Sequence, residues 1–148
     1  ALTLDARQSA TLAATDLFGA FFDTTYAYRF GPPSHDVTVA RLKDAATGDI
    51  IAEAFHFPLG RSKALHEAII ETSLLKGEGG GWTLQLSTDR LAQSVTIHVE
   101  GFRTLEDGFH LGPGSVKHVA LVPMAGTVTD SLPSGTVTAL GSNLVARF

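Results

Sequence analysis

Short runs that alternate apolar and polar residues, separated by glycine, proline and aspartate turns, dominate this chain of 148 residues. Side chains at alternate positions of a strand face opposite sides of a sheet, so each run predicts a strand with one buried face. The clearest run begins at Trp82, because Trp82, Leu84 and Leu86 alternate with polar residues. We predict further strands over residues 24–30, 37–42, 50–57, 94–100, 115–122 and 136–140. Strands that recur every 8–14 residues or so with turns between them indicate an all-β, antiparallel sandwich.

The stretch from Arg61 to Lys76 fits two structures. Its apolar residues follow a helical stripe, and Ser62 and Gly77 are suited to the two ends of a helix. The alternative is a linker followed by a strand from Ile69 to Lys76.

Composition excludes several classes of protein. Hydrophobic residues make up 44% of the chain, enough for a core, which argues against disorder. No run reaches the ~18 apolar residues of a membrane helix, and the net charge of -4 lacks the basic excess of proteins that bind nucleic-acid backbones. We therefore expect neither a membrane nor a nucleic-acid partner. The absence of cysteine excludes disulfides and thiol chemistry and leaves the compartment open, with the cytoplasm slightly favoured.

No pattern of residues predicts a catalytic centre. A retaining glycosidase needs two carboxyl groups ~5–5.5 Å apart, and nothing in the sequence brings two glutamates together. The scattered glutamates are Glu53, Glu67, Glu71, Glu78, Glu100 and Glu106. There is no G-x-S-x-G elbow, and the glycine cluster at residues 77–81 lacks the lysine of a phosphate loop, so a hairpin connection is its preferred interpretation.

Metal and cofactor sites are equally unsupported. His98 and His118 would need to lie on neighbouring strands, with a third ligand, to hold a metal ion. No spacing motif favours this, so we expect separate imidazoles, no metal ligands and no cofactor.

Exposed aromatic rings are a further source of function, because a flat ring can stack on a sugar. Tyr26 and Tyr28 fall on one face of a predicted strand and are the candidate carbohydrate-binding residues. Trp82 shares its face with Leu84 and Leu86, so we expect it to anchor the core instead.

Two segments carry a resemblance to a known family. Residues 81–95, with the turn Thr88-Asp89-Arg90-Leu91-Ala92, resemble the start of the last module of family 2 β-mannosidases. Residues 105–114 are similar to that family's Ser-Asp-Asn-Phe-Phe-Asp-Leu-Leu-Pro-Gly stretch. The positions that match there are Asp107, Phe109, Leu111, Pro113 and Gly114.

Upstream, residues 38–42 and 53–58 resemble the end of the preceding module, so the resemblance spans residues 36–140. It departs from the family at Gly108, where the family has Asn, and at Ser115, where the family has Glu. Residues 59–66 also replace the family's proline-rich linker.

The resemblance implies a multi-module enzyme that hydrolyses terminal β-D-mannose residues. Its catalytic glutamates lie on a (β/α)8 barrel, and immunoglobulin-like sandwiches follow the barrel. A barrel needs ~250 residues, more than this chain has, and no barrel motif is matched. The chain also starts at Ala1, with neither Met nor a signal peptide. We therefore expect a C-terminal piece of such an enzyme.

On this basis residues 1–62 form the C-terminal part of a penultimate immunoglobulin-like module that lacks its opening strands. Residues 63–148 form a complete C-terminal immunoglobulin-like module. The resemblance also favours the strand over the helix for Ile69 to Lys76.

The expected function is that of a non-catalytic accessory region that packs against the barrel and the other modules of the parent chain. The alternative is a carbohydrate-binding module that holds mannose-containing glycans through exposed aromatic side chains. An independent hydrolase is the least favoured reading. The truncated first module should leave an aromatic face uncovered and so promote self-association. The residues expected on that face are Phe18, Phe21, Phe22, Phe55 and Phe57.

Overall fold

The computed structural model describes residues 2–28, 30–128 and 131–148. Its sheets are all antiparallel, as the sequence predicts. The chain forms two compact units, residues 1–64 and residues 65–148. The sequence analysis places this boundary between residues 62 and 63.

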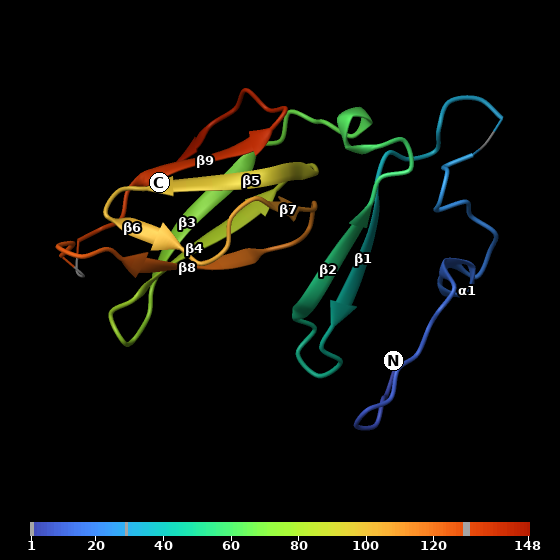
Figure 1. Cartoon of the computed structure of the whole chain (residues 1–148), viewed down its shortest axis with the longest axis horizontal. Helices are drawn as coiled ribbons and strands as arrows, with labels where there is room; N and C mark the ends of the chain where they lie inside the picture. Colours follow the sequence, from blue (N-terminus) through green and yellow to red (C-terminus); the bar gives the residue numbers. More distant parts are fainter. Residues whose placement is uncertain (1, 29, 129–130) are drawn as a thin grey trace. The chain divides into compact units, whose positions relative to one another are not determined.

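The second unit is a β-sandwich of two four-stranded sheets (Figure 1). One sheet has the order β3-β4-β8-β6, formed by Ile70–Lys76, Trp82–Thr88, Lys117–Pro123 and Phe102–Thr104. The other has the order β10-β9-β5-β7, formed by Ala146–Arg147, Gly135–Leu140, Ala92–Val99 and Phe109–Leu111. The strand expected from Ile69 to Lys76 is confirmed as β3, and the helical alternative is wrong.

The order of strands in this sandwich is that of an immunoglobulin constant-type domain. With the short β7 set aside, one sheet holds the first, second, fifth and fourth strands of the unit, and the other holds the third, sixth and seventh. β7 adds one more strand beside β5. The short β6 and β7 follow one another in sequence, and each forms the edge of a different sheet.

Alternation along β4 and β5 builds the core between the two sheets. Leu84 and Leu86 on β4 are fully buried, and Val95 on β5 is too. Burying one such side chain stabilises a fold by about 1.5–3 kcal/mol, so this layer supplies much of the stability of the unit. Trp82 packs against the same cluster but remains half-buried, because it lies at the end of β4.

The first unit contains one short helix and one hairpin. The helix α1 (Ala14–Phe18) is a single turn with no buried residue. The strands β1 (Thr38–Lys43) and β2 (Ile50–His56) pair with each other, and a short 3-10 helix η1 (Arg61–Lys63) follows. This hairpin is the only sheet among the described residues of the unit. A two-stranded sheet alone is marginally stable in water, so the unit contains less than a complete sandwich.

The strand predicted over residues 24–30 is wrong. The chain turns at residues 24–26, and Ala27 is buried with a left-handed φ of 54°, outside the range of regular strand backbone. The cause is Asp23, whose side chain binds backbone N–H groups that a strand would need for pairing. Residue 29 of this segment lies outside the described part of the chain.

Candidate functional site

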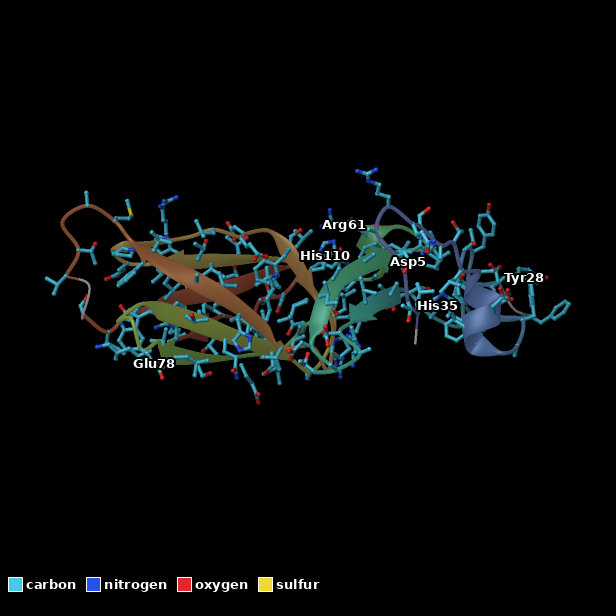
Figure 2. The ribbon with its side chains drawn as sticks, turned by 90° about the horizontal axis from the view of Figure 1, so that it is seen from below. Asp5, Tyr28, His35, Arg61, Glu78 and His110 are labelled. Atoms are coloured by element: carbon cyan, nitrogen blue, oxygen red, sulfur yellow. The ribbon has the colours of Figure 1, made fainter. Side chains whose placement is uncertain are left out.

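Tyr26 and Tyr28, the predicted carbohydrate-binding pair, lie on an aspartate-centred turn rather than on a strand. The carboxylate of Asp23 accepts hydrogen bonds from the N–H groups of Thr25 (3.1 Å), Tyr26 (3.0 Å) and Tyr28 (3.2 Å). Both tyrosine side chains are exposed, Tyr26 by 72% and Tyr28 by 69%. Figure 2 shows Tyr28 at the surface of the first unit.

The electrostatics of this turn centre on Asp23. The hydrogen bond from Tyr26 N–H is the main cause that holds the pKa of Asp23 below its ordinary value, and those from Tyr28 and Thr25 act in the same direction. A positive charge on His35 would lower the pKa further. The turn thus depends on an ionised carboxylate, and it fixes the backbone from which both tyrosines project.

A second site lies at one end of the sandwich in the second unit, where β4, β8 and β6 meet the β3–β4 loop. We call it the Trp82 pocket. It has a volume of about 430 Å³. Its lining residues are Gly79, Gly80, Gly81, Trp82, Phe102, Leu121 and Pro123.

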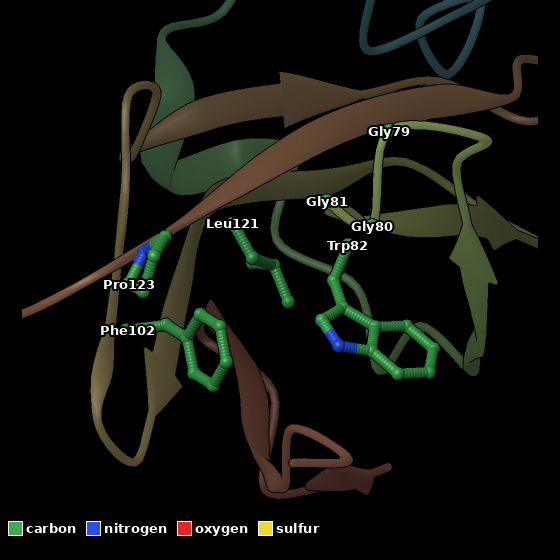
Figure 3. Close-up of a pocket in the computed structure, with 7 residues that line it drawn as sticks. All are labelled: Gly79, Gly80, Gly81, Trp82, Phe102, Leu121 and Pro123. Carbon is green, nitrogen blue, oxygen red and sulfur yellow. The ribbon is translucent and has the colours of Figure 1, made fainter. Parts of the chain in front are cut away.

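Strand pairing explains why these residues meet. Trp82 is the register partner of Leu121, and Phe102 is the partner of Pro123, so three strands bring their apolar side chains to the same end of one sheet. The glycine loop closes above them through a hydrogen bond from Gly77 N–H to the carbonyl of Gly81 (2.8 Å). In Figure 3 the rings of Trp82 and Phe102 stand on opposite sides, with Leu121 between them.

The indole of Trp82 carries the one polar side-chain atom among the lining residues of this pocket. Its Nε1 atom is buried and has no hydrogen-bond partner among the described residues. Figure 3 shows this nitrogen on the edge of the indole that faces Phe102. The Nζ atom of Lys76 lies 5.4 Å from the centre of the indole ring, a cation–π contact. The pocket therefore combines apolar side chains with the backbone of the glycine loop, and the indole nitrogen beside it is closed to solvent.

The sequence analysis missed this pocket as a site. It assigned Trp82 to the core, and it treated the glycine cluster as a hairpin connection. The sequence around Leu121 and Pro123 contains no motif that indicates a binding site. Only the register of β4, β8 and β6 brings these residues together, and no local motif encodes that register.

Four of the six scattered glutamates bind partners on different parts of the fold. Glu53 pairs with Arg41 at 2.7 Å, and Glu106 pairs with Lys117 at 2.6 Å. Glu71 accepts from the Ser87 hydroxyl, and Glu67 accepts from the Asn143 amide. These are structural contacts of surface carboxylates.

His98 and His118, which the sequence analysis expected to be separate imidazoles, are not on neighbouring strands. His98 is on β5 and His118 is on β8, and these strands belong to different sheets. The ring of His118 instead contacts the side-chain amide of Gln85, with 3.1 Å between Nε2 and Oε1. Among the residues that the structure describes, no group of three or more potential metal ligands gathers.

Comparisons with known proteins add no assignment. No family model matches the chain, and no curated protein matches it. Among the described residues, no helix has the length and apolar character needed to cross a membrane.

Proposed function

We propose that this chain is a non-catalytic accessory region of a larger glycosidase, similar to the C-terminal region of a family 2 β-mannosidase. In that role the second unit is a terminal sandwich domain. The first unit is an incomplete module that docks against other modules of the same parent chain. The parent reaction would be the hydrolysis of terminal β-D-mannose residues.

The observation that carries the proposal is the apolar surface of the first unit. Phe30 is 96% exposed, Phe21 88% and Leu17 70%. The large apolar side chains exposed on this unit are Leu2, Leu4, Leu12, Leu17, Phe18, Phe21, Phe22, Tyr26, Tyr28, Phe30, Leu42, Ile51 and Leu59. Apolar surface of this extent on a small unit marks an interaction surface.

Not all of the expected aromatic face is uncovered. Phe18, Phe21 and Phe22 are exposed as expected, whereas Phe55 and Phe57 are half-buried. Phe18 and Phe22 lie with ring centroids 5.6 Å apart, so they form one aromatic patch. The docking surface we propose therefore centres on residues 17–30 rather than on β2.

A carbohydrate-binding module is the second candidate, and the turn at Asp23 favours it. Three hydrogen bonds fix the backbone at Tyr26 and Tyr28 while their rings stay exposed, which suits a sugar-stacking pair. The docking function accounts for the wider apolar surface as well, so we prefer it.

The test begins with the reading frame upstream of the codon for Ala1. A frame that encodes a glycosidase barrel supports the accessory role, and a frame that starts at this codon contradicts it. In the encoded protein, the double substitution Phe21→Ser and Phe30→Ser should lower the temperature of thermal inactivation while kcat is retained.

Val116→Ser is the matched control, because Val116 is 51% exposed on the second unit. It should leave the inactivation temperature unchanged. Equal effects of the double substitution and the control would contradict docking through residues 17–30. Loss of mannan binding without loss of thermal stability on substitution of Tyr26 and Tyr28 would favour the carbohydrate-binding module.

A further inference from the structure

The outer face of the strand pair β3–β4 carries two adjoining hollows. Leu84 and Leu86 of β4 are buried in the core, so the residues that alternate with them face outward. The first hollow has a volume of about 140 Å³, and its lining residues are Glu71, Thr72, Ser73, Gln85 and Ser87. The second has a volume of about 240 Å³, and its lining residues are Ile69, Glu71, Ser87, Thr88 and Asp89. Because the two hollows share lining residues, we treat them as one site and call it the β3–β4 groove.

Strand pairing arranges the polar side chains of this groove in rows. Glu71 on β3 is the register partner of Ser87 on β4, and Ser73 is the partner of Gln85. The hydroxyl of Ser87 donates a hydrogen bond of 3.3 Å to Oε2 of Glu71. These four side chains project from paired strands, which hold them in a more defined pattern than a loop would.

Asp89 and Ile69 form the far end of the groove. The Asp89 carboxylate accepts a hydrogen bond of 2.8 Å from the N–H of Ile69, and Nε of Arg90 lies 3.8 Å from its other oxygen. The side chain of Ile69 is 57% exposed, so it places an apolar surface next to this carboxylate.

The groove offers both donors and acceptors to a ligand. Oε1 of Gln85 lies 3.1 Å from Nε2 of His118, which leaves the NH₂ group of Gln85 to donate. Glu71 uses one carboxylate oxygen for Ser87, and a carboxylate oxygen accepts more than one hydrogen bond. The hydroxyl of Ser73 can act in either sense.

This mixture selects a ligand that carries several hydroxyl groups. Each hydroxyl group both donates and accepts, so neighbouring hydroxyls can pair with a carboxylate and an amide at the same time. An anionic ligand would meet the like charges of Glu71 and Asp89, and a wholly apolar ligand would remove water from these carboxylates without replacing its hydrogen bonds. A sugar ring avoids both costs, and its C–H face can rest on Ile69.

We propose that the β3–β4 groove binds a saccharide, whose hydroxyl groups donate to the Glu71 carboxylate and accept from the NH₂ group of Gln85. The groove lies on the second unit, whereas the docking surface and the tyrosine pair lie on the first. The proposal does not rest on the accessory function, and its failure would leave that function untouched.

Chemical shifts in a ¹H–¹⁵N correlation spectrum of the whole chain measure the binding. The probes are methyl β-D-glucopyranoside and methyl β-D-mannopyranoside. The control compound is 2-methoxytetrahydropyran, which keeps the ring and the methoxy group but has no hydroxyl. At least one glycoside should move the NH₂ peaks of Gln85 and the amide peaks of Ser73 and Ser87 in a saturable manner. The control compound should bind about tenfold more weakly or not at all, because it cannot donate to the carboxylate.

Glu71→Gln and Ser87→Val are the disrupting variants. The first keeps the shape of the side chain but removes the charge that strengthens its hydrogen bonds, and the second removes a hydroxyl that lines both hollows. Thr83→Val is the matched control, because Thr83 alternates with Leu84 on the same strand and lines neither hollow. Each disrupting variant should weaken glycoside binding by about tenfold and the control by less than about twofold, while the backbone amide spectrum verifies that all three are folded.

Four results would overturn the proposal. The first is no saturable shift with either glycoside up to its solubility limit. The second is an equal loss of binding in Thr83→Val and the disrupting variants. The third is a stronger response of these peaks to ethylammonium or Ca²⁺, which would make the groove a cation site. The fourth is a response confined to the amides of Tyr26 and Tyr28, which would place sugar binding on the first unit.

Discussion

The Nδ1 atom of His110 accepts a hydrogen bond of 3.0 Å from the backbone N–H of Ser94, a residue held at a left-handed φ of 44°. Ser94 lies in a bulge of β5, where the register with both neighbouring strands shifts. A left-handed φ is unfavourable for a residue with a Cβ, and a bulge leaves an N–H outside the regular ladder. His110 on β7 thus satisfies the donor that the bulge releases.

Replacing His110 should therefore destabilise the second unit. His110→Phe keeps a ring of similar size but removes the acceptor, so the half-buried N–H of Ser94 loses this hydrogen bond. We expect a loss of about 1–3 kcal/mol in the free energy of unfolding, measured by urea denaturation. His118→Phe is the control, because that ring is exposed and forms its hydrogen bond with the Gln85 side chain, and it should change stability by less than about 0.5 kcal/mol. Equal losses of unfolding free energy in the two variants would show that the hydrogen bond from Ser94 to His110 does not contribute specifically to stability.

Trp82 and Leu84 should both contribute to the stability of the core, although they lie at different depths on β4. Leu84 is fully buried, and Leu84→Ala should cost about 2–5 kcal/mol. Trp82 is half-buried beside a pocket, so Trp82→Ala should cost about 3 kcal/mol, the low end for an aromatic residue in a core. Denaturation midpoints of the two variants measure this. A loss below about 1 kcal/mol for Trp82→Ala would mean that the indole does not anchor the core.

Long alternating runs in the sequence predicted long strands successfully. The runs at residues 50–57 and 94–100 became β2 and β5, and the run that starts at Trp82 became β4. The strands that escaped prediction, β6, β7 and β10, have only two or three residues, too few to show a period of two.

The failure at residues 24–30 has a different cause. Tyr26, Tyr28 and Phe30 alternate as a strand would, but Asp23 offers its carboxylate to three nearby N–H groups. Aspartate side chains compete with ladder pairing in this way, and the competition is decided by local geometry.

The Trp82 pocket could not be predicted for another reason. Its residues come from three strands and a loop, and only the register of the strands brings them together.

The turn at Asp23 should respond to acid. Hydrogen bonds to its carboxylate hold the folded-state pKa below the ordinary value of 3.8, so the stabilisation is fully present above pH 3.8 and is lost as pH falls through the lower folded-state value. The amide resonances of Thr25, Tyr26 and Tyr28 should then shift together as the carboxyl group takes up its proton. In Asp23→Asn these resonances should not titrate. A midpoint above pH 3.8 in the native chain would contradict the hydrogen-bonding scheme.

The chain by itself should not hydrolyse β-mannosides. Four of its glutamates are bonded to Arg41, Lys117, Ser87 and Asn143 on separate parts of the fold, and this arrangement does not form a catalytic pair. A sensitive assay with an aryl β-mannoside measures this. The non-catalytic role would be refuted by activity that co-purifies with the protein and is lost when one of these glutamates is changed to Gln.

The exposed aromatic residues of the first unit should drive association of the isolated chain. Phe21 and Phe30 present nearly their whole side chains to water, and burying apolar surface contributes about 25 cal/mol per Å². Without the modules that we propose as partners, a second copy of the chain offers the nearest apolar surface. Light scattering over a concentration series should show an average mass that rises above 15.6 kDa. The double substitution Phe21→Ser and Phe30→Ser should restore the monomer, while Val116→Ser should not. A native chain that stays monomeric at high concentration would mean that these side chains do not form an interaction surface. That result would contradict the proposed docking role.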